Sequence, residues 1–250
     1  MTMRKVHAYQ RGMSLISLMV ALTIGLFLLA GLFQIWFQTR QTFSAQGQLA
    51  QLQDSQRNVL TTMANTVQTG GYYPVYLNYS ATPPATPYTA TNSFPTGGVF
   101  IVGGGQFLFG PYSATAPGDT LTVRYIADKT NGDSTTLDCQ GQAEATGTLV
   151  TNTYQVLNGL LQCSTDGGTT WQPIITNGVQ NMSILYGVDT LADGKTLQYM
   201  TAAQVTAGSF WTKVISVNIQ LTFNNPLYGQ AGQPQYLPVN RIVAITQTNQ

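Results

Sequence analysis

The sequence predicts an α+β protein in which a long N-terminal helix, transmembrane in its first half and amphipathic in its second, precedes a β-rich globular domain. Three observations predict this fold class: an uncharged apolar run near the N-terminus, a proline-free helical period beyond it, and alternating segments separated by turns in the rest of the chain. Only 8% of the 250 residues are charged, and the formal net charge is +1. Because binding to nucleic acid by bulk electrostatics needs a clustered basic surface, we expect no nucleic-acid partner.

The N-terminal run is long enough to cross a lipid bilayer. Residues 1–12 contain Arg4, Lys5 and Arg11 without an acid, and no charge follows until Arg40. The apolar core of this run, Met13–Trp36, spans roughly 36 Å as a helix, which exceeds a hydrocarbon core of about 30 Å. The positive flank precedes the apolar run, so we expect a cytoplasmic N-terminus and a C-terminal domain on the far side of the membrane.

The helical period continues beyond the apolar run. Leu52, Val59, Met63 and Val67 follow a spacing close to 3.6 residues, and no proline occurs in residues 13–73. Gly70-Gly71 then provides a stop signal. The pattern predicts one continuous helix of about 55 residues, which is roughly 80 Å long.

The remaining chain has the pattern of β-strands and turns. Residues 74–97 are rich in Pro, Thr and Ala and predict an exposed loop, with a glycan-bearing or contact loop as the alternative. Residues 216–223 (SVNIQLTF) alternate apolar and polar side chains, as a half-buried strand does. Strands are predicted at Val99–Val102, Gln106–Phe109, Thr120–Ile126, Gly147–Leu161, Thr170–Ile175, Asn181–Tyr186, Leu197–Met200, Val214–Phe223 and Arg241–Thr246.

The sequence offers few groups for catalysis. Its single histidine, His7, lies in the basic N-terminal stretch, and its nine acids fall mostly in predicted turns, where a solvated side chain is expected. Residues 128–138 (DKTNGDSTTLD) place several side chains with potential oxygen ligands around a glycine turn, but they do not match the D-x-[DN]-x-[DN]-G pattern of a calcium loop. We therefore expect no enzyme, no cofactor and no metal site, with calcium at 128–138 as a minor alternative.

The two cysteines, Cys139 and Cys163, are expected to form a disulfide. Both lie in the part of the chain placed outside the cytoplasm, where disulfides persist, and two thiolates alone cannot complete a structural zinc site. Two buried free thiols are the alternative.

Several segments resemble a known family. Residues 11–22 (RGMSLISLMVAL) resemble the class III signal of type IV pilins, a short basic leader and a glycine followed by a hydrophobic helix. Further segments resemble the minor pilins of the PilW type: GDTLTVRY (118–125), DCQG (138–141), YQVLNGLLQC (154–163), WQPIITNGVQNMSILYGVD (171–189) and FWTKVISVNIQL (210–221).

The resemblance implies a specific processing site and a domain plan. A prepilin peptidase would cleave between Gly12 and Met13 and methylate the new amino group of Met13, whereas an uncleaved signal anchor is the alternative. Ser17 stands at the fifth mature position, where the family usually has Glu. The plan comprises a cleaved leader (1–12), a transmembrane and polymerisation helix (13–36), its amphipathic extension (37–69) and a β-rich periplasmic minor-pilin domain (74–250), together a pilin-like lollipop.

The function implied by the resemblance is structural. The chain would be a minor pilin that helps prime assembly of a type IV pilus and lies in or near its tip. Its implied partners are other minor pilins, the major pilin, the prepilin peptidase, the inner-membrane assembly platform, the lipid bilayer and a tip adhesin. It would reside in the inner membrane with a single pass, and in the pilus after assembly. The alternatives are a J-type pseudopilin of type II secretion and a membrane-anchored adhesin or binding module that does not polymerise.

Overall fold

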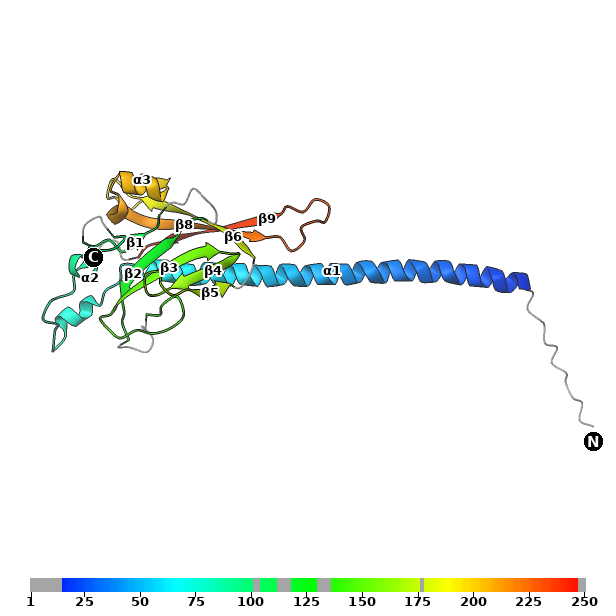
Figure 1. The fold of residues 1–250 in the computed structure, drawn as a ribbon, viewed down its shortest axis with the longest axis horizontal. Coiled ribbons are helices and arrows are strands. Elements are labelled where there is room, and N and C mark those ends of the chain that lie inside the picture. Colours follow the sequence, from blue (N-terminus) through cyan, green and yellow to red (C-terminus); the bar gives the residue numbers. More distant parts are fainter. Residues whose placement is uncertain (1–14, 101–103, 112–117, 130–135, 176–177, 247–250) are drawn as a thin grey trace, which may run out of the picture. The chain divides into compact units, whose positions relative to one another are not determined.

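The computed structural model describes residues 15–100, 104–111, 118–129, 136–175 and 178–246. The chain divides into two units, Met1–Gln51 and Leu52–Gln250. Helix α1 (Leu15–Thr69) starts in the first unit and ends in the second (Figure 1). Its 55 residues confirm the predicted continuous helix.

Polar side chains in the first part of α1 bond to the helix itself. The hydroxyls of Thr23 and Thr39 donate to the carbonyl oxygens of Val20 and Ile35, at 2.9 and 2.8 Å. A hydroxyl that is satisfied within its own helix adds little cost to an apolar environment. These threonines are therefore compatible with the apolar run that surrounds them.

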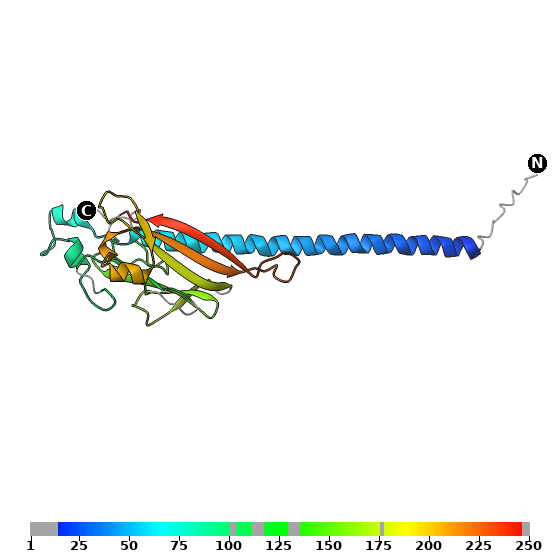
Figure 2. The ribbon, with the colours of Figure 1, turned by 90° about the horizontal axis from the view of Figure 1, so that it is seen from above.

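The second unit contains two antiparallel sheets (Figures 1 and 2). The first has the order β1-β2-β3-β4-β5, and the second has the order β7-β6-β8-β9. The strands of the first sheet are β1 (Leu108–Phe109), β2 (Leu121–Ile126), β3 (Leu149–Leu157), β4 (Leu160–Ser164) and β5 (Gln172–Ile175). Those of the second sheet are β6 (Val179–Val188), β7 (Gln198–Met200), β8 (Val214–Asn224) and β9 (Tyr236–Ala244). Short helices complete the unit: α2 (Ala90–Ser93), α3 (Ala202–Ala207), η1 (Val75–Tyr79) and η2 (Trp211–Lys213).

One hydrophobic core joins the end of α1 to both sheets. Val59, Met63 and Val67 on α1 are fully buried in the same cluster as Val123 of β2 and Ile219 of β8. The alternation predicted for residues 216–223 is confirmed, since Val217, Ile219, Leu221 and Phe223 are all buried. The C-terminal end of α1, from Val59 to Val67, thus belongs to the core of the second unit.

Gly70 ends α1 where the backbone comes close to the first sheet. A Cβ atom at this position would lie 2.7 Å from Cγ1 of Val123 and 3.0 Å from the carbonyl oxygen of Val67. The next residue, Gly71, has φ +79° and donates its N–H to the carbonyl oxygen of Arg124 at 2.9 Å. The predicted stop signal therefore also provides the close approach that joins the helix to β2.

Three sequence predictions about the strands were wrong in detail. The single strand predicted for Gly147–Leu161 is a hairpin, because Asn158 and Gly159, with φ of 52° and 77°, turn the chain between β3 and β4. The strand predicted from Arg241 begins at Tyr236 instead, since pairing with β8 extends to Asn224. Residues Val99 and Phe100 form a turn with an isolated bridge rather than a strand, and residues 101–103 lie outside the described chain.

The segment predicted as a low-complexity loop, 74–97, contains ordered structure. It includes η1 and α2, and Phe94 at its end is 1% exposed and packs on Phe107. The side-chain amide of Asn78 bonds to the backbone of Tyr88 in both directions, at 2.9 and 2.7 Å. The packing of Phe94 and the hydrogen bonds of Asn78 therefore order an uncharged, proline-rich segment whose structure cannot be predicted from its composition alone.

The longer edge strands both contain proline. Pro173 lies in β5 at the edge of the first sheet, and Pro238 lies in β9 at the edge of the second. Proline cannot donate to a further strand, which makes an edge a poor template for adding another chain.

Candidate functional site

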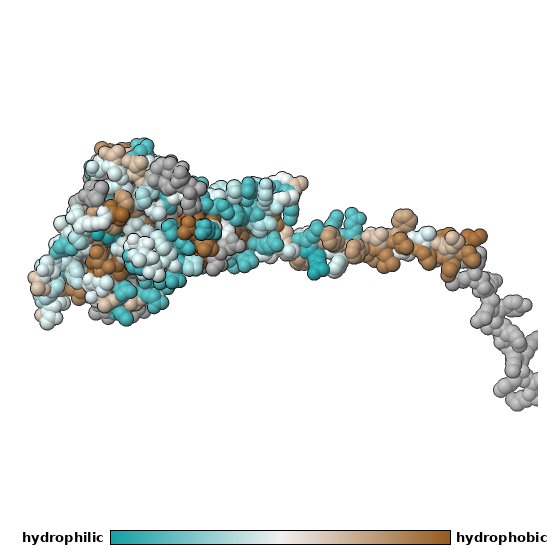
Figure 3. Space-filling model, in the orientation of Figure 1, coloured by the Kyte–Doolittle hydropathy of each residue, from teal (hydrophilic) through white to brown (hydrophobic). Residues whose placement is uncertain are grey.

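The first part of α1 presents a continuous apolar surface. Its large apolar side chains from Leu15 to Phe43 are between 50% and 80% exposed. Figure 3 shows this stretch as the hydrophobic end of the helix. The helix is long and apolar enough to cross a membrane. An exposed apolar surface of this length marks a contact with lipid or with other helices.

The predicted processing site precedes this surface. Gly12 and Met13 lie outside the described residues, so their cleavage and methylation stay predictions. Ser17 lies in the first turns of α1, and its side chain is exposed. The position that usually carries a carboxylate in the resembling family therefore faces the surroundings of the helix.

The predicted disulfide is confirmed. Cys139 and Cys163 are bonded, with their Cα atoms 6.3 Å apart, and both residues are buried. The bond joins the connection between β2 and β3 to strand β4. The backbone N–H of Cys139 also donates to Oδ1 of Asn152 at 3.2 Å, so the same connection is held on β3.

Four of the acids in the described part of the chain are buried, and the prediction of solvated turn residues is wrong for them. Asp119, Asp128, Asp138 and Asp189 are at most 8% exposed. Asp138 accepts the N–H groups of Gln140 and Gln142, both at 2.8 Å. Backbone amides that converge on a carboxylate fix the loop around it.

Asp189 and Asp119 also accept backbone N–H groups. Asp189 accepts N–H groups from Leu191, Asp193 and Gly194 at 2.7–3.3 Å, which fixes the loop between β6 and β7. Asp119 accepts the N–H of Ile184 at 2.8 Å. The chain entering the first sheet is thereby joined to β6 of the second.

Asp128, the first acid of the calcium-like segment, bonds to two tyrosines. The hydroxyl of Tyr72 donates to Oδ2 at 2.8 Å, and that of Tyr76 contacts both carboxylate oxygens at 2.8 and 2.9 Å. Burial raises the pKa of Tyr72, and the hydrogen bond to Asp128 raises it further. Residues 130–135 lie outside the described chain, and within the described part no three His, Cys, Asp or Glu side chains gather around a metal position.

Arg124 is a buried cation that the sequence analysis missed. It is 4% exposed on β2, and its guanidinium donates to the carbonyl oxygens of Pro95, at 2.9 Å, and of Gln106. The guanidinium carbon lies 3.6 Å from the ring centroid of Phe100. Burial lowers its pKa to about 10, which leaves it charged at neutral pH. The alternation of Leu121, Val123 and Tyr125 assigns Arg124 to the other face of β2, but both faces of this strand are buried, so the local pattern does not identify it.

Two protein-family models match parts of the chain. Residues 123–244 match the model of the type IV pilus-assembly protein W (PilW) family, and residues 7–33 match the prokaryotic N-terminal methylation motif. A type IV-like pilin from Thermus thermophilus aligns with 79% of this chain and 98% of its own length, at 14% identity and a TM-score of 0.39. No curated protein matches the chain.

An N-terminal methylation motif on an exposed apolar helix, followed by an antiparallel β domain, defines the class of type IV pilin-like proteins. The match to the PilW family, residues 123–244, runs from β2 to β9 and so includes most of both sheets.

Proposed function

We propose that this chain is a minor pilin that helps to prime a type IV pilus and lies in or near its tip. The observation that carries the proposal is the apolar surface of α1 from Leu15 to Phe43, next to a prepilin-type motif. Such a surface needs lipid before assembly and neighbouring helices afterwards. The prolines in β5 and β9 favour assembly through the helix rather than through strand addition.

The proposal includes cleavage between Gly12 and Met13, methylation of Met13, and insertion in the inner membrane with the N-terminus in the cytoplasm. The test is mass spectrometry of the N-terminal peptide from the membrane fraction and from sheared pili. A methylated peptide that starts at Met13 in both fractions is expected. A retained leader with membrane-only location would instead support an anchored binding module, and a processed chain absent from pili would support a pseudopilin.

Gly12→Val tests the cleavage site directly. A larger side chain at this position hinders approach to the peptidase, so the variant is expected to accumulate at the size of the precursor. Gly31→Val is the matched control, since Gly31 lies in α1 with nothing within 4 Å of an added Cβ. Mature-sized Gly12→Val protein would show that cleavage occurs elsewhere.

Ser17 supports a position at the tip. A subunit there has no pilin above it whose amino group needs a carboxylate, so a hydroxyl suffices at this position. Ser17→Glu would bury an unpaired carboxylate at a cost of about 2.5–3.5 kcal/mol on insertion scales, and piliation is expected to fall. Ser17→Gln, similar in size but uncharged, is the matched control and is expected to assemble. Unchanged or improved assembly of Ser17→Glu would contradict the tip position.

A further inference from the structure

The first unit carries a single positive charge on the described part of its helix. Arg40 is the only charged residue between Arg11 and Gln51, and Met1–Gln51 contains no Asp or Glu. The next acid along the chain is Asp54, 14 residues further, or about 21 Å along a helix. Arg40 therefore has no carboxylate partner within its own unit.

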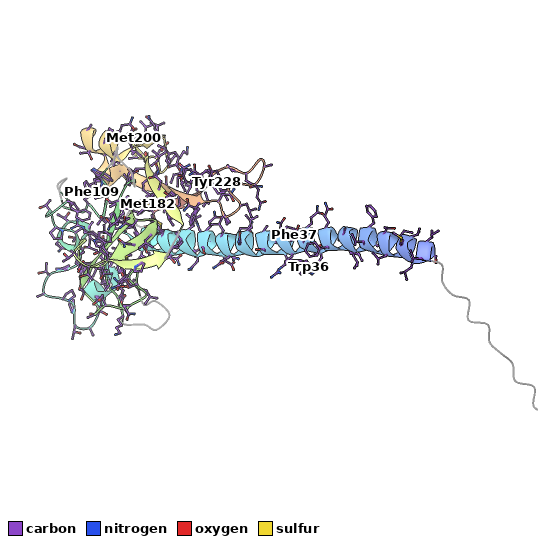
Figure 4. All side chains as sticks on the ribbon, turned by 45° about the vertical axis from the view of Figure 1, so that its right-hand side comes forward. Trp36, Phe37, Phe109, Met182, Met200 and Tyr228 are labelled. Carbon is purple, nitrogen blue, oxygen red and sulfur yellow. A yellow bond between two sulfur atoms is a disulfide. The ribbon has the colours of Figure 1, made fainter. Side chains whose placement is uncertain are left out.

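Arg40 is associated with an aromatic side chain one turn earlier. Its guanidinium carbon lies 5.5 Å from the ring centroid of Trp36, which in turn lies 5.9 Å from the ring of Phe33. Figure 4 shows Trp36 and Phe37 projecting from the helix. Side chains on a helix lean toward its N-terminus, so Arg40 extends back toward the apolar stretch instead of away from it. The cation and the indole together form one amphipathic group.

The helix rise places this group at one defined depth. From Leu15 to Trp36 the helix rises about 32 Å, close to a hydrocarbon core of about 30 Å. Arg40 lies four residues further, about 6 Å along the helix. If Leu15 lies at the cytoplasmic edge of the hydrocarbon, Trp36 reaches the outer edge of the hydrocarbon and Arg40 reaches the headgroups.

We propose that Arg40 and Trp36 form a binding site for the phosphate of an outer-leaflet phospholipid, and that this site sets the depth of α1 in the membrane. The proposal rests on the proposed function, because it requires the helix to be inserted. Guanidinium groups bind phosphate through paired N–H donors, and tryptophan favours the interface between hydrocarbon and headgroups. The lipid phosphate supplies the negative charge that the first unit lacks.

The test measures the depth of the full-length chain in vesicles of phosphatidylglycerol and phosphatidylethanolamine. Single cysteines are introduced at each position from Leu32 to Gln46 except Trp36 and Arg40, and labelled with a membrane-impermeant maleimide without reductant, so that the native disulfide stays unreactive. We expect protection up to Ile35 and full labelling from Gln41 onward. Arg40→Gln should let the outer end sink, so that the Gln41→Cys reporter labels at least threefold more slowly.

Three controls distinguish the site from general membrane insertion. Arg40→Lys keeps the charge and should restore most of the labelling, whereas Arg57→Gln removes another exposed helix arginine and should change nothing. In vesicles of a neutral galactolipid without phosphate, the unaltered Arg40 chain should label like Arg40→Gln. Labelling of Arg40→Gln within twofold of the parent, or an unchanged boundary in galactolipid, would overturn the phosphate site. Full labelling at every position would instead refute membrane insertion, and with it the proposed function.

Discussion

Removal of the Cys139–Cys163 disulfide should destabilise the second unit mainly through its unfolded state. The bonded residues are 24 positions apart. In the chain-entropy model, a loop of about 25 residues loses about 12 cal/mol/K on closure, which stabilises the fold by about 3.5 kcal/mol at 25 °C. Asp138 and Asn152 hold the same connection in the folded state through hydrogen bonds to Gln140, Gln142 and Cys139, so we expect little change there.

The assay is thermal unfolding of the full chain in detergent, followed by circular dichroism for the parent and for the Cys139→Ala/Cys163→Ala variant. For a unit of this size, about 3.5 kcal/mol corresponds to a decrease in Tm of about 7–14 °C. Reductant should lower the Tm of the parent by a similar amount and leave that of the variant unchanged. A loss below about 1 kcal/mol would show that the connection is already closed in the unfolded chain, and would refute the entropic explanation.

Three further substitutions test the core and the loops. Arg124→Met should lower the free energy of unfolding by about 2–4 kcal/mol, because the carbonyl oxygens of Pro95 and Gln106 stay buried without a donor. Faster hydrogen exchange confined to residues 94–107 is the expected signature, and unchanged exchange there would contradict the prediction. Gly70→Ala should lower the free energy of unfolding by about 1–3 kcal/mol through the clash of the added Cβ with Val123. At Gly47 nothing lies within 4 Å of an added Cβ, so Gly47→Ala should leave the midpoint of urea unfolding unchanged or raise it slightly. Hydrogen bonds from the Ser164 hydroxyl and from backbone N–H groups hold the pKa of Asp166 below its usual range. The carboxylate therefore stabilises the fold above about pH 4, its unfolded pKa, and this contribution is lost as the pH falls. Asp166→Asn should flatten the decrease in the urea midpoint between about pH 4 and pH 2, and an unaltered slope would count against this assignment.

Local patterns in the sequence determined the helix and most of the strands. The absence of proline from residues 13–73 and the double glycine at 70–71 set the length of α1. The alternation in residues 216–223 identified the buried face of β8. Such features depend on neighbours along the chain, so a single sequence contains them. Asn158-Gly159 is an equally local turn signal, but apolar residues on both sides of it favour a single strand in the sequence pattern.

The roles of the charged residues were decided by distant contacts. Asp119 looked like a solvated turn residue, but its partner is Ile184 in the other sheet. Asp128 was predicted to be a solvated turn residue, with calcium binding as a minor alternative, but it is buried, and Tyr72 and Tyr76 bond to it from the segment after α1. A carboxylate has the same local signature in a solvated turn and in a buried one, because the difference lies in which donors the fold brings to it.

The sequence by itself determined that the chain carries a prepilin-like signal, a membrane-length apolar helix and a β-rich domain with one pair of cysteines. Only the tertiary structure decided how the two sheets are ordered, which strands form their edges, and that the few charges of the domain hold its loops in place. The physical reason is the distance along the sequence over which each interaction acts. Hydropathy and turn propensity act over a few residues, whereas strand order and the pairing of buried charges depend on groups separated by tens of positions, such as Arg124 with Pro95 and Asp119 with Ile184.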